Sequence, residues 1–228
     1  MKIDLKEYFK QRDHQKEVQL QPGPVITISR DFGCRANEVA NELLNEITNN
    51  PSGQFKNRPW RILNKEIVTE AAKALQRKPY EVEHALKPHE KTLLEEFISS
   101  YSMDRLVDKK IQKGIRDLVT SYARIGNLII VGRAGVAVTR SLDRSLHVKL
   151  EAPLAWRVEY LRRSKGISLE KALALVQQND QCRRVFISHM TNEPYEEAFF
   201  DVTFNRATLS TDAIVKSTLQ LLESKQLI

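Results

Sequence analysis

Cysteine is scarce in this chain, with two residues among 228, Cys34 and Cys182. Two cysteines so far apart form neither a disulfide framework nor the paired spacing of a zinc site, and their scarcity suits a reducing compartment. Long apolar runs are also missing: the run at residues 128–131, for example, covers only four positions. That run is far too short to span a bilayer, and the N-terminal region lacks the apolar stretch of a secretory signal. We therefore expect a cytoplasmic protein without a membrane partner.

Charge, by contrast, is plentiful and unbalanced: 36 Lys and Arg stand against 29 Asp and Glu, a formal net charge of +7 at pH 7. Apolar residues make up 41% of the chain, which is too many for a disordered polypeptide. The positive excess indicates either a merely soluble basic protein or an anionic partner such as nucleic acid, a membrane surface or a phosphorylated small molecule. The basic stretches are interleaved with acids and contain no nucleic-acid-binding motif, so we do not expect a nucleic-acid partner.

Short apolar runs alternate with helical patterns along most of the chain. Buried strands are predicted at residues 25–29, 61–63, 128–131, 146–150 and 200–204. Helices are predicted most clearly at residues 36–47, 104–125, 153–165, 168–188 and 211–224. Strands that are mostly continuous apolar runs and alternate with helices favour an α/β fold, a parallel sheet of about five strands with helices on both faces.

The chain divides into an appendage and one main domain. Residues 1–24 are predicted to form a helix and a linker, which would serve for packing or as an oligomer contact in a homodimer. Within the main domain, residues 25–228, a helical block at 65–125 has no strand and would cap one edge of the sheet. Ligands of such sheets bind outside the carboxyl ends of the strands, so the loops after residues 29, 131 and 150 carry the candidate site.

The loop after the first strand lies where a phosphate-binding loop belongs. The usual pattern, G-x-x-x-x-G-K-[ST], would place its lysine at Ala36 and its hydroxyl at Asn37, so both functional groups are missing. A helix that begins near Ala36 still offers unpaired N–H groups and a positive dipole end, with Arg30 and Arg35 beside it. The residues alone leave two alternatives, an anion site or an ordinary strand-to-helix turn with surface arginines.

Several short segments occur in a characteristic order. They are ITISRDFGCRANEVA at 26–40, NKEI at 64–67, LIIVGRAG at 128–135, APL with a following arginine at 152–157, D-x-x-R at 180–183 and FNRATLS at 204–210. Together they resemble the cytidylate kinase-like family, a branch of the P-loop nucleoside monophosphate kinases. The resemblance covers residues 25–223 and implies a P-loop kinase fold, with an acceptor-binding region at 65–125 and a lid at 157–190. It also implies transfer of the γ-phosphoryl group of ATP to CMP or a related nucleotide, with Mg²⁺.

The resemblance further implies roles for particular residues. Arg133, Arg157 and Arg183 are the expected catalytic residues, because arginine binds phosphate through two nitrogens and keeps its charge. Of the adjacent Arg183 and Arg184, at most one is expected to face the site, because neighbouring helical residues point in different directions. No metal ligand is assigned. Nucleotide and phosphate binding is assigned to Arg30, Gly33, Cys34, Arg35, Ala36, Asn37, Glu38, Arg162 and Arg163.

The phosphate-binding loop departs from the family pattern. Gly33-Cys34-Arg35-Ala36 stands where the family has G-S-G-G, and a positive φ at Arg35 would cost about 1 kcal/mol. The side chain of Arg35 would then either block the phosphate or supply the missing charge. Two hypotheses stay open, an active or weakly active nucleoside monophosphate kinase, and a catalytically inactive descendant that binds a nucleotide or a partner. An open set of N–H groups at residues 30–37 would favour binding, whereas a loop filled by Arg35 would favour a defunct site.

Overall fold

The fold is one parallel sheet between two helical layers. The computed structural model describes residues 22–50, 58–64 and 109–228, so the predicted appendage before residue 22 and most of the helical block at 65–125 lie outside it. Each of the five predicted strands is confirmed within a residue or two of its expected bounds. They are β1 (Val25–Arg30), β2 (Arg61–Leu63), β3 (Leu128–Val131), β4 (Ser145–Glu151) and β5 (Val202–Asn205).

The sheet order is β2-β3-β1-β4-β5, and every neighbouring pair is parallel. The central strand β1 pairs with β3 on one side and β4 on the other, with Val25 opposite both Leu128 and Ser145. Because all five strands run the same way, their carboxyl ends meet at one edge. The loops that follow β1, β3 and β4 are therefore brought together there, as expected for this class of sheet.

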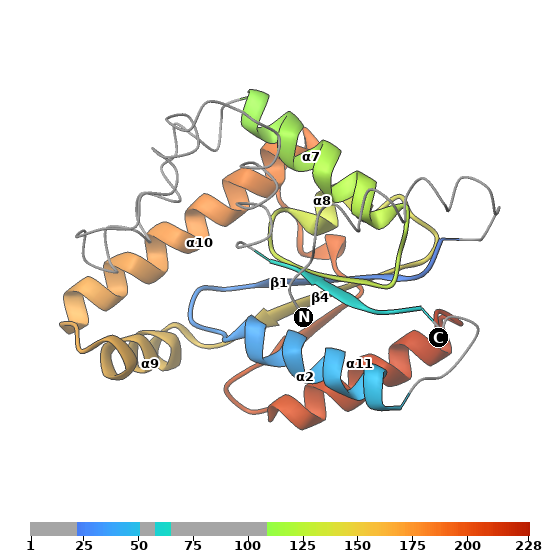
Figure 1. Cartoon of the computed structure of the whole chain (residues 1–228). Helices are drawn as coiled ribbons and strands as arrows, with labels where there is room; N and C mark the ends of the chain where they lie inside the picture. The colour runs from blue at the N-terminus through green and yellow to red at the C-terminus, as the bar shows by residue number, and fades with distance from the viewer. Residues whose placement is uncertain (1–21, 51–57, 65–108) are drawn as a thin grey trace, which may run out of the picture.

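Helices cover both faces of the sheet, which confirms the predicted α/β architecture (Figure 1). Helices α2 and α11 lie on one face, and α7, α8 and α10 lie on the other, while α9 and α10 extend past the carboxyl edge. The short α8 and the 3₁₀ turn η1 were not predicted. None of the described helices is long and apolar enough to cross a lipid bilayer. The bounds are α2 (Ala36–Asn49), α7 (Lys109–Ala123), α8 (Gly135–Thr139), α9 (Leu154–Lys165), α10 (Leu169–Thr191), η1 (Glu197–Phe199) and α11 (Thr211–Ser224).

The two faces of the central strands differ in chemistry. On the face under α2 and α11, aliphatic residues of β1 and β4 such as Ile28 and Val148 pack against Val39 and the other apolar residues of one core. On the opposite face, β4 carries buried polar residues at alternate positions, among them His147 and Lys149. β4 thus departs from the continuous apolar pattern of the other central strands, and hydrogen bonds and ion pairs inside the fold satisfy its polar groups.

Candidate functional site

A crevice opens at the carboxyl edge of the sheet, between the ends of β1, β3 and β4 and the flank of α10. Aromatic residues of the chain after α10, Tyr195 and Phe200, line it as well. The charged side chains around it are five cations and two carboxylates, so an anion is the ligand that this lining favours. The charged residues are Arg30, Asp31, Arg133, Lys149, Asp180, Arg183 and Arg184.

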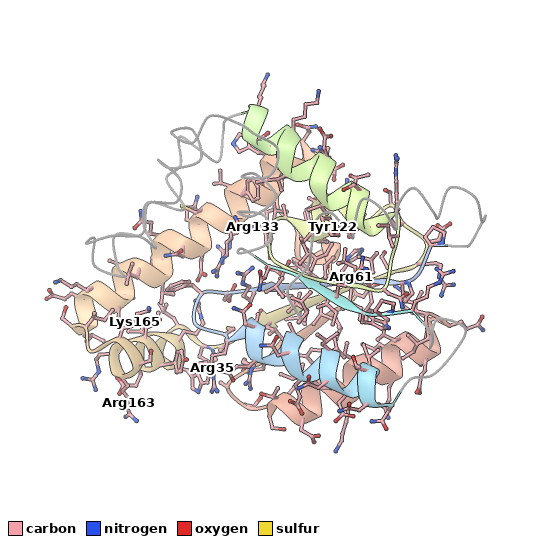
Figure 2. All side chains as sticks on the ribbon, viewed as in Figure 1. Arg35, Arg61, Tyr122, Arg133, Arg163 and Lys165 are labelled. Carbon is pink, nitrogen blue, oxygen red and sulfur yellow. The ribbon has the colours of Figure 1, made fainter. Side chains whose placement is uncertain are left out.

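Arg30 and Arg133 reach the crevice from the ends of two neighbouring strands, β1 and β3. The guanidinium of Arg30 lies so close to Gly132 that a Cβ atom there would stand 1.8 Å from its Nη1. Gly132, Arg133 and Ala134 take positive φ angles of 72°, 54° and 49° in succession, and the turn closes with a 2.8 Å hydrogen bond from the Gly135 N–H to the Gly132 carbonyl. This tight turn places Arg133 above the strand ends (Figure 2).

Helix α10 contributes two arginines to the opposite wall. Arg183 donates from Nη1 to the Arg30 carbonyl over 3.2 Å, and its guanidinium lies 5.2 Å from the centre of the Phe32 ring. Arg184 lines the same crevice, so the expectation that at most one of the pair faces the site was wrong. Neighbouring side chains on a helix point about 100° apart. Arginine is long enough for both side chains to bend toward the same crevice.

The loop between β1 and α2 is not filled by Arg35. That residue has the expected positive φ, 55°, and its guanidinium turns outward to pair with Glu38 and to lie 5.4 Å from the centre of the Tyr160 ring. Two N–H groups of the loop are bound inside the protein instead. Phe32 donates to the Asp180 carboxylate over 2.6 Å, and the Cys34 N–H donates to the Asp31 carbonyl over 3.2 Å.

Arg157 lies behind this loop. Its buried guanidinium donates to Oδ2 of Asp180 over 2.6 Å and to the carbonyls of Phe32 and Ala152 over 3.2 and 2.8 Å. Gly33, with φ 96°, passes so near that a Cβ atom there would lie 3.2 Å from the Cβ of Arg157. Arg157 thus fastens the loop to α9 and α10 and does not line the crevice, so its predicted catalytic role stays a prediction.

The other predicted phosphate-binding residues of the loop differ in how exposed their side chains are. Cys34 and Ala36 are buried, whereas Asn37 and Glu38 are exposed at the start of α2. Burial, followed by the nearby Asp31 carboxylate, raises the pKa of the Cys34 thiol to about 12, so this thiol is not a nucleophile at neutral pH.

The lid arginines 162 and 163 are not brought to the crevice. Both are exposed on α9 and both pair with Glu159, whose pKa they lower to about 2 through their hydrogen bonds. Figure 2 shows Arg163 projecting from α9 at the periphery, far from Arg133. The position of α9 therefore does not support their predicted role in nucleotide binding.

Sequence reasoning missed Lys149, Asp31 and Tyr195, all of which line the crevice. The signal for Lys149 was the alternation of polar and apolar residues from Ser145 to Glu151, which places Lys149 on one face of β4 with His147. Burial raises the pKa of Asp31, and Asp180 raises it further, while Lys149 and two arginines oppose the shift. No signal in the sequence identified Tyr195, because it belongs to the irregular chain after α10.

Comparisons with known proteins bear on the family and the fold of the chain. Residues 25–208 match the model of a family described as the cytidylate kinase-like family. Among solved structures, the chain resembles an uncharacterized protein from Eubacterium ventriosum, with a TM-score of 0.57 and 17% identity over 88% of this chain and 98% of that one. It also resembles shikimate kinase from Bacteroides thetaiotaomicron, with a TM-score of 0.52 and 12% identity over the same shares. A search of the curated proteins finds no match. At these identities the structural likeness shows the P-loop kinase-like fold.

Proposed function

The chain belongs to the cytidylate kinase-like family, and from this premise we propose that it transfers the γ-phosphoryl group of ATP to CMP or a related nucleoside monophosphate. The observation that carries the proposal is the crevice, where Arg30, Arg133 and Arg183 meet at the carboxyl edge of the sheet. Phosphoryl transfer asks a protein mainly to position the reactants and to neutralise charge on the phosphoryl oxygens. Arginines from three separate elements, aimed at one crevice, suit that task.

In this proposal each element has a part. Arg133 binds the phosphate of the acceptor, because its guanidinium can engage two phosphate oxygens from the end of β3. Arg183 neutralises charge on the transferred group from the side of α10. The donor phosphates lie at the first turn of α2, where the N–H groups and the positive dipole end of a 14-residue helix favour an anion.

The crevice also holds a carboxylate suited to Mg²⁺. A bound Mg²⁺ would supply positive charge that offsets the charge of the ATP phosphates, and such an ion is usually held by one or two carboxylates together with phosphate oxygens. Both carboxylates line the crevice, and Asp31 fits this requirement better: it lies 3.7 Å from Arg157, whereas Asp180 accepts hydrogen bonds from Arg157 and from the Phe32 N–H. Among the described residues no group of three or more His, Cys, Asp or Glu forms a metal cage, so the ligand phosphates would complete the coordination.

A second function is favoured by the loop itself. The position of the usual lysine is the buried Ala36, and the N–H groups of Phe32 and Cys34 are bound within the protein. A loop so constrained supports a catalytically inactive protein that binds a nucleotide, or a partner, in the same crevice.

Calorimetric titration with CMP, UMP, AMP and ATP with Mg²⁺ tests binding, and a coupled ADP-release assay tests transfer. Arg133→Gln should weaken monophosphate binding about tenfold or more, because one charge-assisted contact is lost. Arg163→Gln is the matched control: it removes the same charge from an exposed position and should leave binding unchanged. Binding without ADP release would select the inactive nucleotide-binding alternative. No heat from any of the nucleotides would contradict both transfer and nucleotide binding and would favour a partner as the ligand.

A further inference from the structure

Lys149 is a buried cation inside a central strand. Its side chain is 6% exposed, and it stands on β4 opposite Ser29 of β1, near the carboxyl edge of the sheet. A buried ammonium is costly unless it is paired, and a parallel strand otherwise favours aliphatic residues here. Packing alone therefore does not explain why a lysine occupies this buried position of β4.

Lys149 pairs with two exposed carboxylates at different distances, and a ligand could replace either of them. Its Nζ lies 2.6 Å from a carboxylate oxygen of Glu197 in η1 and 3.5 Å from one of Glu151. These carboxylates are 59% and 48% exposed, so each can turn to water at little cost. Burial alone would lower the pKa of Lys149, but the hydrogen bond with Glu197 and the neighbouring Asp31 outweigh it and raise the pKa to about 12. The ammonium thus keeps its charge inside the crevice.

We propose that Lys149 is a phosphate-binding residue of this crevice and that Glu197 occupies its ammonium until a phosphate displaces the carboxylate. The inference rests on the proposed function and deepens it, because it assigns to β4 the lysine charge that the loop before α2 lacks. Lys149 lines the same crevice as Arg30, Arg133 and Arg183, so a phosphate bound by those arginines lies within its reach. A phosphate dianion offers more charge and more acceptor oxygens than a single carboxylate, so it competes successfully for the ammonium.

The displacement of Glu197 involves the segment after α10, which lines the crevice. Tyr195, whose ring centre lies 5.9 Å from Nζ of Lys149, and Phe200 line the crevice on either side of Glu197 in sequence. Burial, together with Glu197, raises the pKa of the Tyr195 hydroxyl to about 12, so this ring stays neutral beside the ammonium. A phosphate that takes the place of Glu197 therefore meets the Lys149 ammonium and a neutral hydroxyl.

The test compares two substitutions with opposite expected signs, using calorimetric titration with CMP and with inorganic pyrophosphate. Lys149→Met should weaken binding of both about tenfold or more, since one charge-assisted contact is removed. Glu197→Gln should tighten binding severalfold, since the competing carboxylate is gone. Both variants are expected to fold: the methionine leaves only exposed carboxylates unpaired, and the glutamine leaves Glu151 beside the lysine. Lys149→Arg should restore most of the affinity.

Lys225→Met is the matched control, because Lys225 pairs with Asp201 outside the crevice and its loss changes the net charge equally. A purely structural ion pair predicts a lower melting temperature for both variants with unchanged affinities, and that result would overturn the inference alone. If Lys149→Met failed to fold, unchanged or weaker binding by Glu197→Gln would still contradict it. If the unsubstituted chain bound neither probe, the proposed function and this inference would fall together.

Discussion

Arg35 shows how a single residue sets the state of the phosphate-binding loop. Its φ of 55° lies in the region that favours glycine, and its guanidinium is held away from the loop by Glu38 and Tyr160. The positive φ could be expected from the sequence, because glycine occupies this position in the family that the segment resembles. The direction of the side chain could not, because Tyr160 comes from α9, far along the chain.

Two substitutions at Arg35 separate backbone strain from side-chain pairing. Arg35→Ala keeps the positive φ and loses the exposed ion pair, whereas Arg35→Gly loses the pair and relieves the strain. The glycine variant should therefore be more stable than the alanine variant by about 1 kcal/mol. Urea unfolding monitored by circular dichroism measures the difference. Equal stabilities would show that the loop relaxes to another backbone conformation.

Between elements, hydrogen bonds of a buried carboxylate join the loop after β1 to α10. Asp180 accepts from the Phe32 N–H and from Arg157, so one carboxylate holds the loop, α9 and α10 in a fixed relation. The bounds of these elements follow from local periodicity, which is why strands and long helices were predicted well. The short α8 was missed because it follows three successive positive φ angles, at residues 132–134, which no apolar pattern reveals.

Asp180→Asn tests the link between the loop and α10. The substitution leaves the 8% exposed guanidinium of Arg157 without its nearest charge, with the Asp31 carboxylate remaining at 3.7 Å. We expect the free energy of unfolding to fall by about 3 kcal/mol, the usual result of breaking one side of a buried pair. Glu159→Gln, which removes an exposed acid from α9, should cost far less in the same urea titration. A similar small loss for both would show that the Arg157 pair contributes little.

Across the whole molecule, a buried polar chain under α8 and α10 links β1 and β4. His147 Nδ1 lies 2.9 Å from the Thr27 hydroxyl and Nε2 lies 3.1 Å from the Ser145 hydroxyl. The Ser145 hydroxyl donates to the carbonyl of Leu142, so it accepts from Nε2–H of His147. Burial lowers the pKa of His147 to about 4, so the ring is neutral at pH 7 and Nδ1 accepts from the Thr27 hydroxyl.

The histidine makes global stability depend on pH. Between pH 4 and the ordinary histidine pKa of 6.5, the unfolded chain binds more protons than the folded one, so stability rises with pH in this window. The contribution of His147, at most about 3 kcal/mol, is fully present above pH 6.5 and is lost toward pH 4. His147→Gln should flatten this part of the profile in urea unfolding at several pH values. His189→Gln, at an exposed position on α10, should leave it unchanged, and an unaltered slope in the His147 variant would contradict the assignment.

The sequence by itself determined the parallel α/β sheet, its strand positions and the family, because local apolar periodicity and short ordered motifs encode them. It also placed Arg30 and Arg133 at the ends of strands that converge, and Arg183 on the helix beside them. Only the tertiary structure decided that Arg157 supports the loop from behind, that Arg162 and Arg163 stay on the surface, and that Lys149 enters the crevice. Those outcomes depend on pairings between residues distant in the chain, such as Arg157 with Asp180 and Lys149 with Glu197, and no local pattern specifies such pairings.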